Sequence, residues 1–564
     1  MARVAPIKAK SRPTAQPMSG GANAPNPSVS LVGNAPYRVI NKGYSEAGAS
    51  TTKRSLKGFV ADSGSAHEDI EFNNYIMRRR ARNLFMSSPL ATSAIVTNRT
   101  NVIGVGLKLR STIDREILGM TSDEAEAWQR NTEREFNLWA SKKNACDALG
   151  INDFNSIQQL VLTSWLISGD CFVLFKQAKT NPLIPYALRL HILEADRIAT
   201  PSANASWSMS CYTTTGKSDK GNPIYDGVEV DSEGAIVAYH VRSNHPFELG
   251  TVKTEWVRIP AYGEKTGNPN ILHIMSSERP EQYRGVSYLA PVIEQLLQIR
   301  RYTESELTAA LVESFFTAFV TTKADASENP LGNVIPGDAP RVRSDPTDLQ
   351  LGSGLINVLE DGEGIEFADP KRPASGFGAF IDVLARQVGA ALDVPADLLM
   401  KYFNKSYSAS RAALLEAWKS FRMRRVWIIS DFCQPTYEVW LSEAVARGRI
   451  TAPGFFTSPE RRAAYLGSEW IGPPPGQLDP IKEVNAEILA CQYGMSTFEQ
   501  STVRLNGGTW NKNIEHRIKE NVKLAEAKAI FDSTSQTTLT TNAPPGENKD
   551  DEEDQDGGND DGDK

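Results

Sequence analysis

Cysteine and histidine are scarce in this chain, and long apolar runs are missing. Its 564 residues contain five cysteines, which lie far apart and never form a C-x-x-C pair, and six histidines. This pattern disfavours a disulfide framework and a zinc knuckle, and it fits a reducing cytosol. No stretch reaches 18 uninterrupted apolar residues, and Pro6, Pro13 and Pro17 break the place where a signal peptide needs an apolar run. We expect neither secretion nor membrane insertion.

Motifs for catalysis, nucleotide binding and metal binding are also missing. Gly216-Lys217-Ser218 resembles the end of a phosphate-binding loop, but Cys211 occupies the position of the required glycine. No H-E-x-x-H motif occurs, and only His240 and His245 are close in sequence. We therefore predict no enzymatic activity, no cofactor and no metal; a DNA-processing enzyme is the less favoured alternative.

The two ends of the chain carry opposite charge. Residues 1–57 hold nine Lys or Arg against one Glu, among many Pro, Gly, Ala and Ser. Residues 547–564 hold ten Asp or Glu against two Lys. Such segments cannot bury enough apolar area to fold, so we predict a flexible basic arm and a disordered acidic tail. Because the ends offset each other, the formal net charge of −7 belongs to the body, which is not a basic nucleic-acid binder.

The first half of the body mixes helical and strand patterns. Helices are predicted at about 70–90, with an interruption at Pro89, after the capping-type cluster Thr121–Glu124, and at about 154–167. Short β-type runs follow between Gly, Pro, Asn and Asp residues, at 171–175, 188–193, 227–230, 235–241 and 271–275. The pattern predicts the α+β class.

A long helical pattern covers 285–320, where apolar residues recur at steps of three and four. About 30 helical residues would span about 45 Å, long enough to bridge two bodies. Residues 325–375 are rich in proline and contain strand-like runs at 355–359 and 364–367. A second helix is predicted at 377–392, so two helices flank a small β-containing module.

Basic residues gather at three further places. Residues 401–410 form a polar loop that mixes basic and aromatic side chains, able to touch phosphates and to slide past stacked bases. Two further clusters lie on predicted helices: Arg78–Arg82, and Arg411, Lys419, Arg422, Arg424 and Arg425. Each cluster has two interpretations: it contacts nucleic acid, or it is a helix surface that faces solvent or a neighbouring subunit. Farther on, Gly472–Gly476 predicts a stiff linker and Asp479-Pro480 the start of a polar helix.

Several segments, in this order, resemble those of one known family, the lambda-type portal proteins of tailed bacteriophages, over roughly residues 70–530. The segments that carry the resemblance are Asn101–Gly106, Leu193–Ile198, Gly227–Asp231, His273, Arg279–Gly285, Tyr288–Val292, Pro336-Gly337, Asp361–Gly364, Val394-Pro395, Ser406–Ala412, Trp470–Pro474 and Asp479-Pro480. No single segment would suffice, and together they are specific.

The resemblance implies a portal fold with a mixed α/β wing, a two-helix stem, a β-containing clip and a helical crown. The expected divisions are the arm 1–57, wing 58–283, stem helix 284–321, clip 322–375, second stem helix 376–396, tunnel loop 397–411, long helix and wing return 412–476, crown 477–532 and tail 533–564. It also implies a homododecameric ring at one capsid vertex of the virion, assembled in the host cytoplasm, through which DNA is packaged and ejected.

The resemblance further implies partners and contact residues. The partners are the large terminase subunit, scaffold and major capsid proteins, a head-completion or adaptor protein, and double-stranded DNA held without sequence specificity. The tunnel-loop residues expected to face DNA are Lys401, Tyr402, Asn404, Lys405, Ser406, Tyr407, Ser408 and Arg411. The clip residues expected to face terminase are Arg341, Arg343, Asp345, Asp348, Glu360 and Asp361. The closest alternative is another head structural or connector ring protein.

Overall fold

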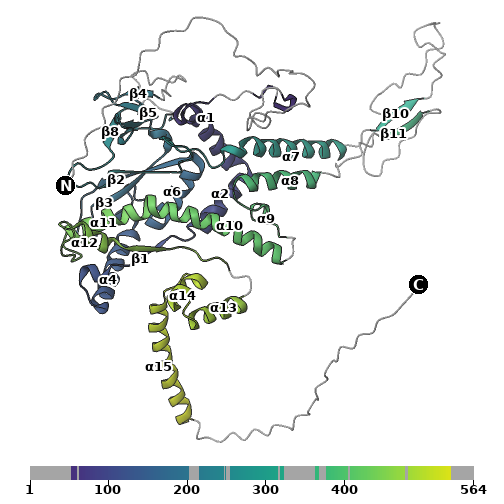
Figure 1. Ribbon diagram of the computed structural model, residues 1–564. Helices are drawn as coiled ribbons and strands as arrows, with labels where there is room; N and C mark the ends of the chain where they lie inside the picture. The colour runs from purple at the N-terminus through teal and green to yellow at the C-terminus, as the bar shows by residue number, and fades with distance from the viewer. Residues whose placement is uncertain are drawn as a thin grey trace, which may run out of the picture. The chain divides into compact units, whose positions relative to one another are not determined.

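A computed structural model describes most of the body of the chain. The described residues are 53–56, 58–59, 63–201, 215–246, 248, 254–314, 318–322, 363–367, 377–403, 407–476 and 480–534. The chain divides into two compact units, Met1–Ser63 and Gly64–Lys564. The first includes a short 3-10 turn, Arg54–Leu56. The second unit holds the elements described below (Figure 1).

Helices near the start of the second unit begin at recognisable caps. Helix α1 (Ala66–Ser87) starts at a capping box between Ser65 and Glu68, and α2 (Pro89–Val102) has its proline in the first turn. Helix α4 (Ser122–Ala140) starts at a capping box of Thr121 and Glu124. These reciprocal bonds satisfy backbone N–H groups that a helix start leaves unpaired. The predicted interruption at Pro89 and the predicted cap at Thr121 are both confirmed.

Two antiparallel sheets follow. The first has the order β3-β2-β9, and α6 (Phe154–Ser168) packs beside it. The second is a meander, β4-β5-β6-β7-β8. The strands are β2 Asp170–Gln177, β3 Leu188–Leu193, β4 Thr215–Lys217, β5 Pro223–Tyr225, β6 Val228–Val230, β7 Ile236–Arg242, β8 Trp256–Pro260 and β9 Ile271–Met275. This mixture of helices and antiparallel strands confirms the α+β prediction.

The main core joins distant parts of the sequence through aromatic rings. The ring of Phe136 lies 5.0 Å from that of Trp440 and 5.5 Å from that of Phe154, centroid to centroid. Strand β1 (Lys108–Ser111) pairs antiparallel with β12 (Ser468–Ile471), which closes the same region. The other elements here are α3 Arg115–Leu118, α5 Lys143–Cys146, α10 Tyr407–Ile428, the π-helical segment Ile429–Cys433, α11 Gln434–Ala446 and α12 Pro459–Leu466.

The long helix is shorter than the sequence predicts. After a 3-10 turn at Ala290–Val292, helix α7 covers Ile293–Ser314, about 33 Å of helix. Ala318–Thr322 is strand β10, paired antiparallel with β11 (Glu363–Phe367), so the prediction of helix up to residue 320 is wrong. The β-branched run Val320–Thr322 suits a strand, and its pairing partner lies some forty residues away.

Two helices still flank the strand pair. Helix α8 (Phe377–Ala391) lies beside α7, with the ring of Tyr302 packed 5.3 Å from Phe377 and 5.1 Å from Phe380 (Figure 1). The predicted strand at 364–367 is confirmed by β11, whereas the predicted strand at 355–359 lies outside the described residues. The predicted order of helix, β-containing module and helix is therefore present.

The predicted loop 397–411 is largely helical. Helix α9 covers Ala396–Met400 and α10 begins at Tyr407, which leaves 401–406 between the two helices. Beyond the linker, three helices follow as predicted for a helical region: α13 Pro480–Gln492, α14 Phe498–Asn506 and α15 Trp510–Thr534. Within the described part of the chain, every helix is too short or too polar to cross a bilayer.

Candidate functional site

Residues 401–403, which we call the α9–α10 turn, directly follow α9 and present their side chains to solvent. Lys401 ends α9 in the left-handed conformation with φ 52°, and the Tyr402 N–H donates to the Asp397 carbonyl at 3.0 Å. The side chain of Lys401 is exposed, and Tyr402 and Phe403 are 62% and 54% exposed. One cation and two aromatic rings thus stand next to one another at the surface.

The base of this turn is held by buried polar contacts. The Ser93 hydroxyl donates to the Leu399 carbonyl at 2.6 Å, and the Tyr288 hydroxyl donates to the Leu392 carbonyl. Arg424 donates to Asn98 Oδ1 at 2.9 Å, and its guanidinium lies 4.8 Å from the centre of the Tyr288 ring. These bonds connect α2 to α9 and to α10, and they connect the segment before α7 to Leu392, directly after α8, so the exposed turn stands on a well-connected base.

The predicted tunnel-loop residues are only partly described. Tyr407 and Ser408 lie in the first turn of α10, and Arg411 is half-buried on the same helix. Outside the described residues lie Asn404, Lys405 and Ser406, together with all six predicted clip residues, Arg341, Arg343, Asp345, Asp348, Glu360 and Asp361. Their assigned contacts stay predictions.

Each of the two helical arginine clusters has buried members, and for those residues both interpretations are wrong, whereas Arg79, Arg80, Lys419 and Arg422 are exposed. Arg78 and Arg424 are nearly inaccessible. Arg425 donates to the carbonyls of Val102 and Pro473, both at 2.9 Å, and burial lowers its pKa to about 10. Because these guanidiniums hold backbone and side chains together, they are neither solvated nor able to contact nucleic acid.

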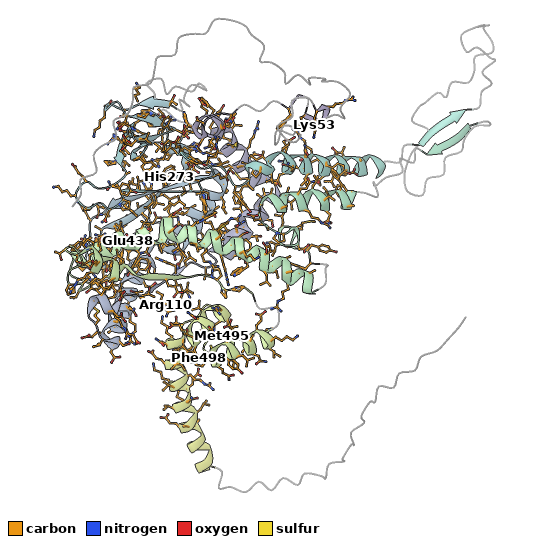
Figure 2. All side chains as sticks on the ribbon, in the orientation of Figure 1. Lys53, Arg110, His273, Glu438, Met495 and Phe498 are labelled. Carbon is orange, nitrogen blue, oxygen red and sulfur yellow. The ribbon has the colours of Figure 1, made fainter. Side chains whose placement is uncertain are left out.

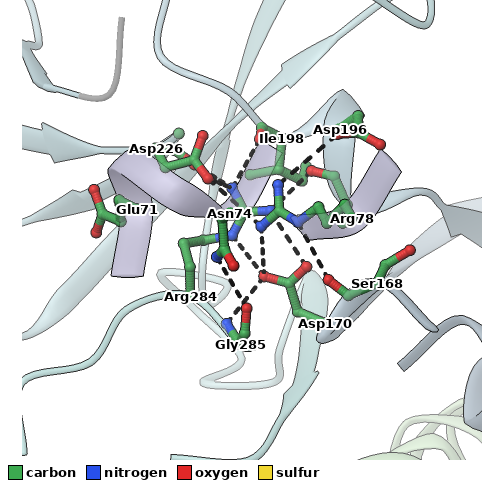
Figure 3. Close-up of polar contacts among 12 residues, drawn as sticks. Glu71, Asn74, Arg78, Ser168, Asp170, Asp196, Ile198, Asp226, Arg284 and Gly285 are labelled. Carbon is green, nitrogen blue, oxygen red and sulfur yellow. Dashed lines mark hydrogen bonds and ion pairs between the residues drawn. The ribbon is translucent and has the colours of Figure 1, made fainter. Parts of the chain in front are cut away.

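Arg284 lies at the centre of a buried ion cluster, shown in Figure 3. Its guanidinium is 0% exposed and donates to Asp170 Oδ2 at 2.6 Å and to the carbonyls of Ala195 and Ile198 at 2.8 and 2.9 Å. Asp226 Oδ2 lies 2.7 Å from it. The remaining members lie around these: Glu71, Asn74, Arg78 and Asp196. We call the whole set the Arg284 cluster.

The charges in the cluster are arranged so that positive and negative groups compensate. Burial by itself raises the pKa of Asp170, but the guanidiniums of Arg284 and Arg78 hold that pKa well below its usual range. Burial, together with the nearby Asp226 carboxyl, raises the pKa of Glu71 to about 9. Burial also lowers the pKa of His67. Glu71 is therefore protonated near neutral pH, and its carboxyl group contacts Nδ1 of His67.

The cluster joins two of the sequence segments on which the family resemblance depends and lies directly next to a third. Arg284 belongs to Arg279–Gly285, its carbonyl acceptors to Leu193–Ile198, and Asp226 directly precedes Gly227–Asp231. Next to the cluster, the backbones of Gly285 and Gly169 lie very close together, since a Cβ on Gly285 would lie 1.9 Å from the Gly169 carbonyl oxygen. Sequence patterns did not predict this cluster, because its members lie far apart along the chain and have no shared periodicity.

One group of side chains in the described region has the donor types of a metal site. Donor atoms of Glu194, Asp196 and His245 lie within 4.8 Å of one another. However, Arg82 is already ion-paired with Asp196, and Arg78 lies 3.9 Å from the same carboxylate. The guanidiniums supply the positive charge that a cation would bring, so we assign no metal here.

Comparison with known proteins identifies the class and then the family. Residues 52–425, more than half of the chain, match the family model described as "Phage portal protein, lambda family". Portal proteins of phages are structural, non-enzymatic components of the virion. The chain belongs to the lambda family of phage portal proteins.

Curated relatives agree with this assignment. Portal protein B of Escherichia phage lambda is 22% identical over 79% of this chain and 83% of its own length. The portal protein of Escherichia phage N15 is 22% identical over 83% of this chain and 88% of its own length. A solved chain from the virion of a native gene transfer agent particle covers 76% of this chain and 92% of its own length at 16% identity, with a TM-score of 0.40. The family assignment rests on the sequence matches.

Proposed function

We propose that this protein is the subunit of a homododecameric portal ring at one capsid vertex, through which double-stranded DNA enters during packaging and leaves during ejection. In this proposal the subunit is assembled in the host cytoplasm and becomes part of the virion. Scaffold and major capsid proteins surround the ring, and a head-completion or adaptor protein later connects it to the tail.

The proposed role as a DNA conduit rests on the α9–α10 turn. Its exposed Lys401, Tyr402 and Phe403 stand on a base fixed by Arg424 and Tyr288. A lysine contacts phosphates without sequence preference, and aromatic rings offer apolar surface to a passing duplex. Because its base is held by these contacts, such a turn can contact moving DNA and keep its conformation. We therefore assign the DNA-facing role to residues 401–411.

The overall charge supports passage rather than retention. The chain carries a formal net charge of −7, with 68 acidic against 61 basic residues. A strongly basic channel would bind many phosphates and release their counterions, which would hold the DNA in place. A negative body with only a few basic contacts keeps those contacts weak, as translocation requires.

The helix pair α7 and α8 supports the stem and clip assignments. These helices flank the strand pair β10–β11 in the chain, an order expected of a stem that carries a small module. We propose that residues 322–375 form the clip, which docks the terminase motor and later the head-completion protein. Its charged residues Arg341, Arg343, Asp345, Asp348, Glu360 and Asp361 are the proposed contacts.

A paired set of variants tests the DNA-facing role. In Lys401→Ala/Tyr402→Ala, the exposed cation and ring are removed while the buried base stays intact, so rings should form normally and the yield of filled heads should fall. The matched control is Tyr262→Ala/Lys265→Ala, in the exposed segment between β8 and β9, where Tyr262 is 63% exposed. The yield of filled heads is measured by sedimentation. An equal yield for both variants would overturn the assignment.

A further inference from the structure

The C-terminal helices α13, α14 and α15 have no apolar core of their own. Among residues 480–527, whose side chains the structure describes, only Ser496 and Ser501 are buried. Large apolar side chains are instead exposed on all three helices, and Met495, at the turn between α13 and α14, is 80% exposed (Figure 2). Helices of this length are marginal in water unless an apolar face is covered. These three helices therefore need a partner surface.

The contacts that hold these helices in place within one subunit are mostly polar or lie at the surface. The Ser501 hydroxyl donates to Glu487 at 2.6 Å, and the rings of Phe498 and Trp510 stack at 4.8 Å. Toward the body, Arg110 lies 2.7 Å from Glu499, and both side chains are about one-quarter exposed. Solvated pairs of this kind contribute little to stability. They position the helices without replacing a core.

Two separate apolar stripes run along these helices. On α15, Ile514, Ile518 and Val522 recur at steps of four, which places them on one face; Ile518 and Val522 are exposed. On α13, Ile481, Val484 and Ile488 recur at steps of three and four, and Ile481 and Ile488 are exposed. A ring of identical subunits needs two different complementary surfaces on each subunit, because each contact is head to tail.

The charges beside the α15 stripe point to another copy of this chain rather than to DNA. Helix α15 contains five Lys or Arg and four Asp or Glu, distributed along its length. A polyanion would be recognised by cations of one sign, whereas mixed signs let similar helices lie side by side without repulsion. The charge pattern and the second apolar stripe on each subunit thus both indicate that another copy of this chain covers the α15 stripe.

We propose that the α15 stripe of one subunit packs against the α13 stripe of the next, so that α13–α15 become stably folded only when the ring closes. This inference rests on the proposed ring. It adds that the C-terminal helices supply an essential part of the contact between subunits, and it names the side chains that form it. In the free subunit these helices open readily, while the body stays folded.

A double variant of the full chain tests the contact. Ile518→Gln/Val522→Gln removes the apolar stripe but keeps good helix-forming residues. Native mass spectrometry over a concentration series gives the concentration at which half of the protein is in rings, and it should rise at least about tenfold because apolar area is lost from every contact. The control, Asn513→Gln/His516→Gln, changes two exposed residues on the opposite face of α15 and should leave that concentration unchanged.

Hydrogen exchange on the unaltered protein provides an independent measurement. Amides of residues 510–527 should be protected in rings and exchange at least about a hundredfold faster in dissociated subunits, whereas amides of α6 should differ little. Equal assembly of both double variants, or fast exchange of α15 within closed rings, would overturn the inference and leave the ring intact as a proposal. If the unaltered chain forms no ring under any condition, the proposed function itself fails.

Discussion

Residues 64–476 and residues 480–534 reach helical structure in different ways. The first region buries an aromatic core around Phe136 and compensates its buried charges in the Arg284 cluster. The second begins α14 with a capping box and repeats apolar residues regularly, yet the described part buries none of its large apolar side chains. Caps and periodicity are therefore sufficient to specify a helix, but burial decides whether that helix is stable alone.

The largest expected effect tests whether the body depends on its ion cluster. Arg284→Met should destabilise the dissociated subunit by about 3–5 kcal/mol, because Asp170 and Asp226 would be left buried without their main cation. Urea unfolding of the subunit measures the change. As a control, Arg300→Met removes a surface pair with Glu304 and should cost less than about 0.5 kcal/mol. Similar values for the two would show that the cluster does not hold the body together.

A second comparison separates buried from exposed arginines on one helix. Arg424→Met should cost roughly 2–3 kcal/mol, because Asn98 Oδ1 loses its buried donor and Tyr288 loses the guanidinium packed on its ring. Arg422→Met, two residues away and exposed, should change the unfolding free energy within about 0.5 kcal/mol. The same urea titration measures both. Equal effects would contradict the role of Arg424 in fixing the base of the α9–α10 turn.

Glu71 makes the stability of the body depend on pH. Its folded-state pKa of about 9 lies above its ordinary value of 4.5, so the folded protein keeps a proton that the unfolded chain has lost. The stability contributed by protonated Glu71 is fully present below pH 4.5 and is lost as pH rises through about 9.

The variant Glu71→Gln isolates this dependence. It keeps a neutral side chain of the same shape, so relative to the unaltered protein it should gain roughly 1 kcal/mol of unfolding free energy per pH unit between pH 6 and 9. Above about pH 9 the difference should level off. Urea midpoints at several pH values provide the measurement. A difference that does not vary with pH would show that Glu71 is ionised in the folded protein.

The smallest expected effects on stability come from two similar capping boxes, one in each region. Thr121→Ala, at the start of α4, should lower the global unfolding free energy by about 1 kcal/mol, since α4 contributes to the main core. Thr497→Ala, at the start of α14, should leave the unfolding of the dissociated subunit unchanged and only speed amide exchange within α14. If Thr497→Ala lowered global stability as much as Thr121→Ala, the two regions would not differ as described.

Elements with strong local signals were predictable from the sequence. The strands at 188–193 and 271–275 have the predicted bounds, and α6 begins at Phe154 as predicted. By contrast, the apolar periodicity of 285–320 continued through Phe319 although Ala318–Thr322 pairs as a strand. The deciding interaction there is long-range, with 363–367, and local periodicity does not contain it.

The candidate site was predictable only in part. The mixture of Lys401 with Tyr402 and Phe403 predicted an exposed basic and aromatic turn, and these three residues are exposed. The arginines at 78 and 424 were expected at the surface because charged residues are rarely buried without partners. Their partners, Asp170 and Asn98, come from distant segments, so only the folded chain brings them together.

The ring itself is tested most directly by native mass spectrometry of the purified full-length protein, combined with negative-stain images of the same sample. We expect closed rings of about twelve subunits with a central hole, each subunit contributing 61.9 kDa. A chain that stays monomeric at high concentration and in the presence of scaffold protein would contradict the proposed portal ring.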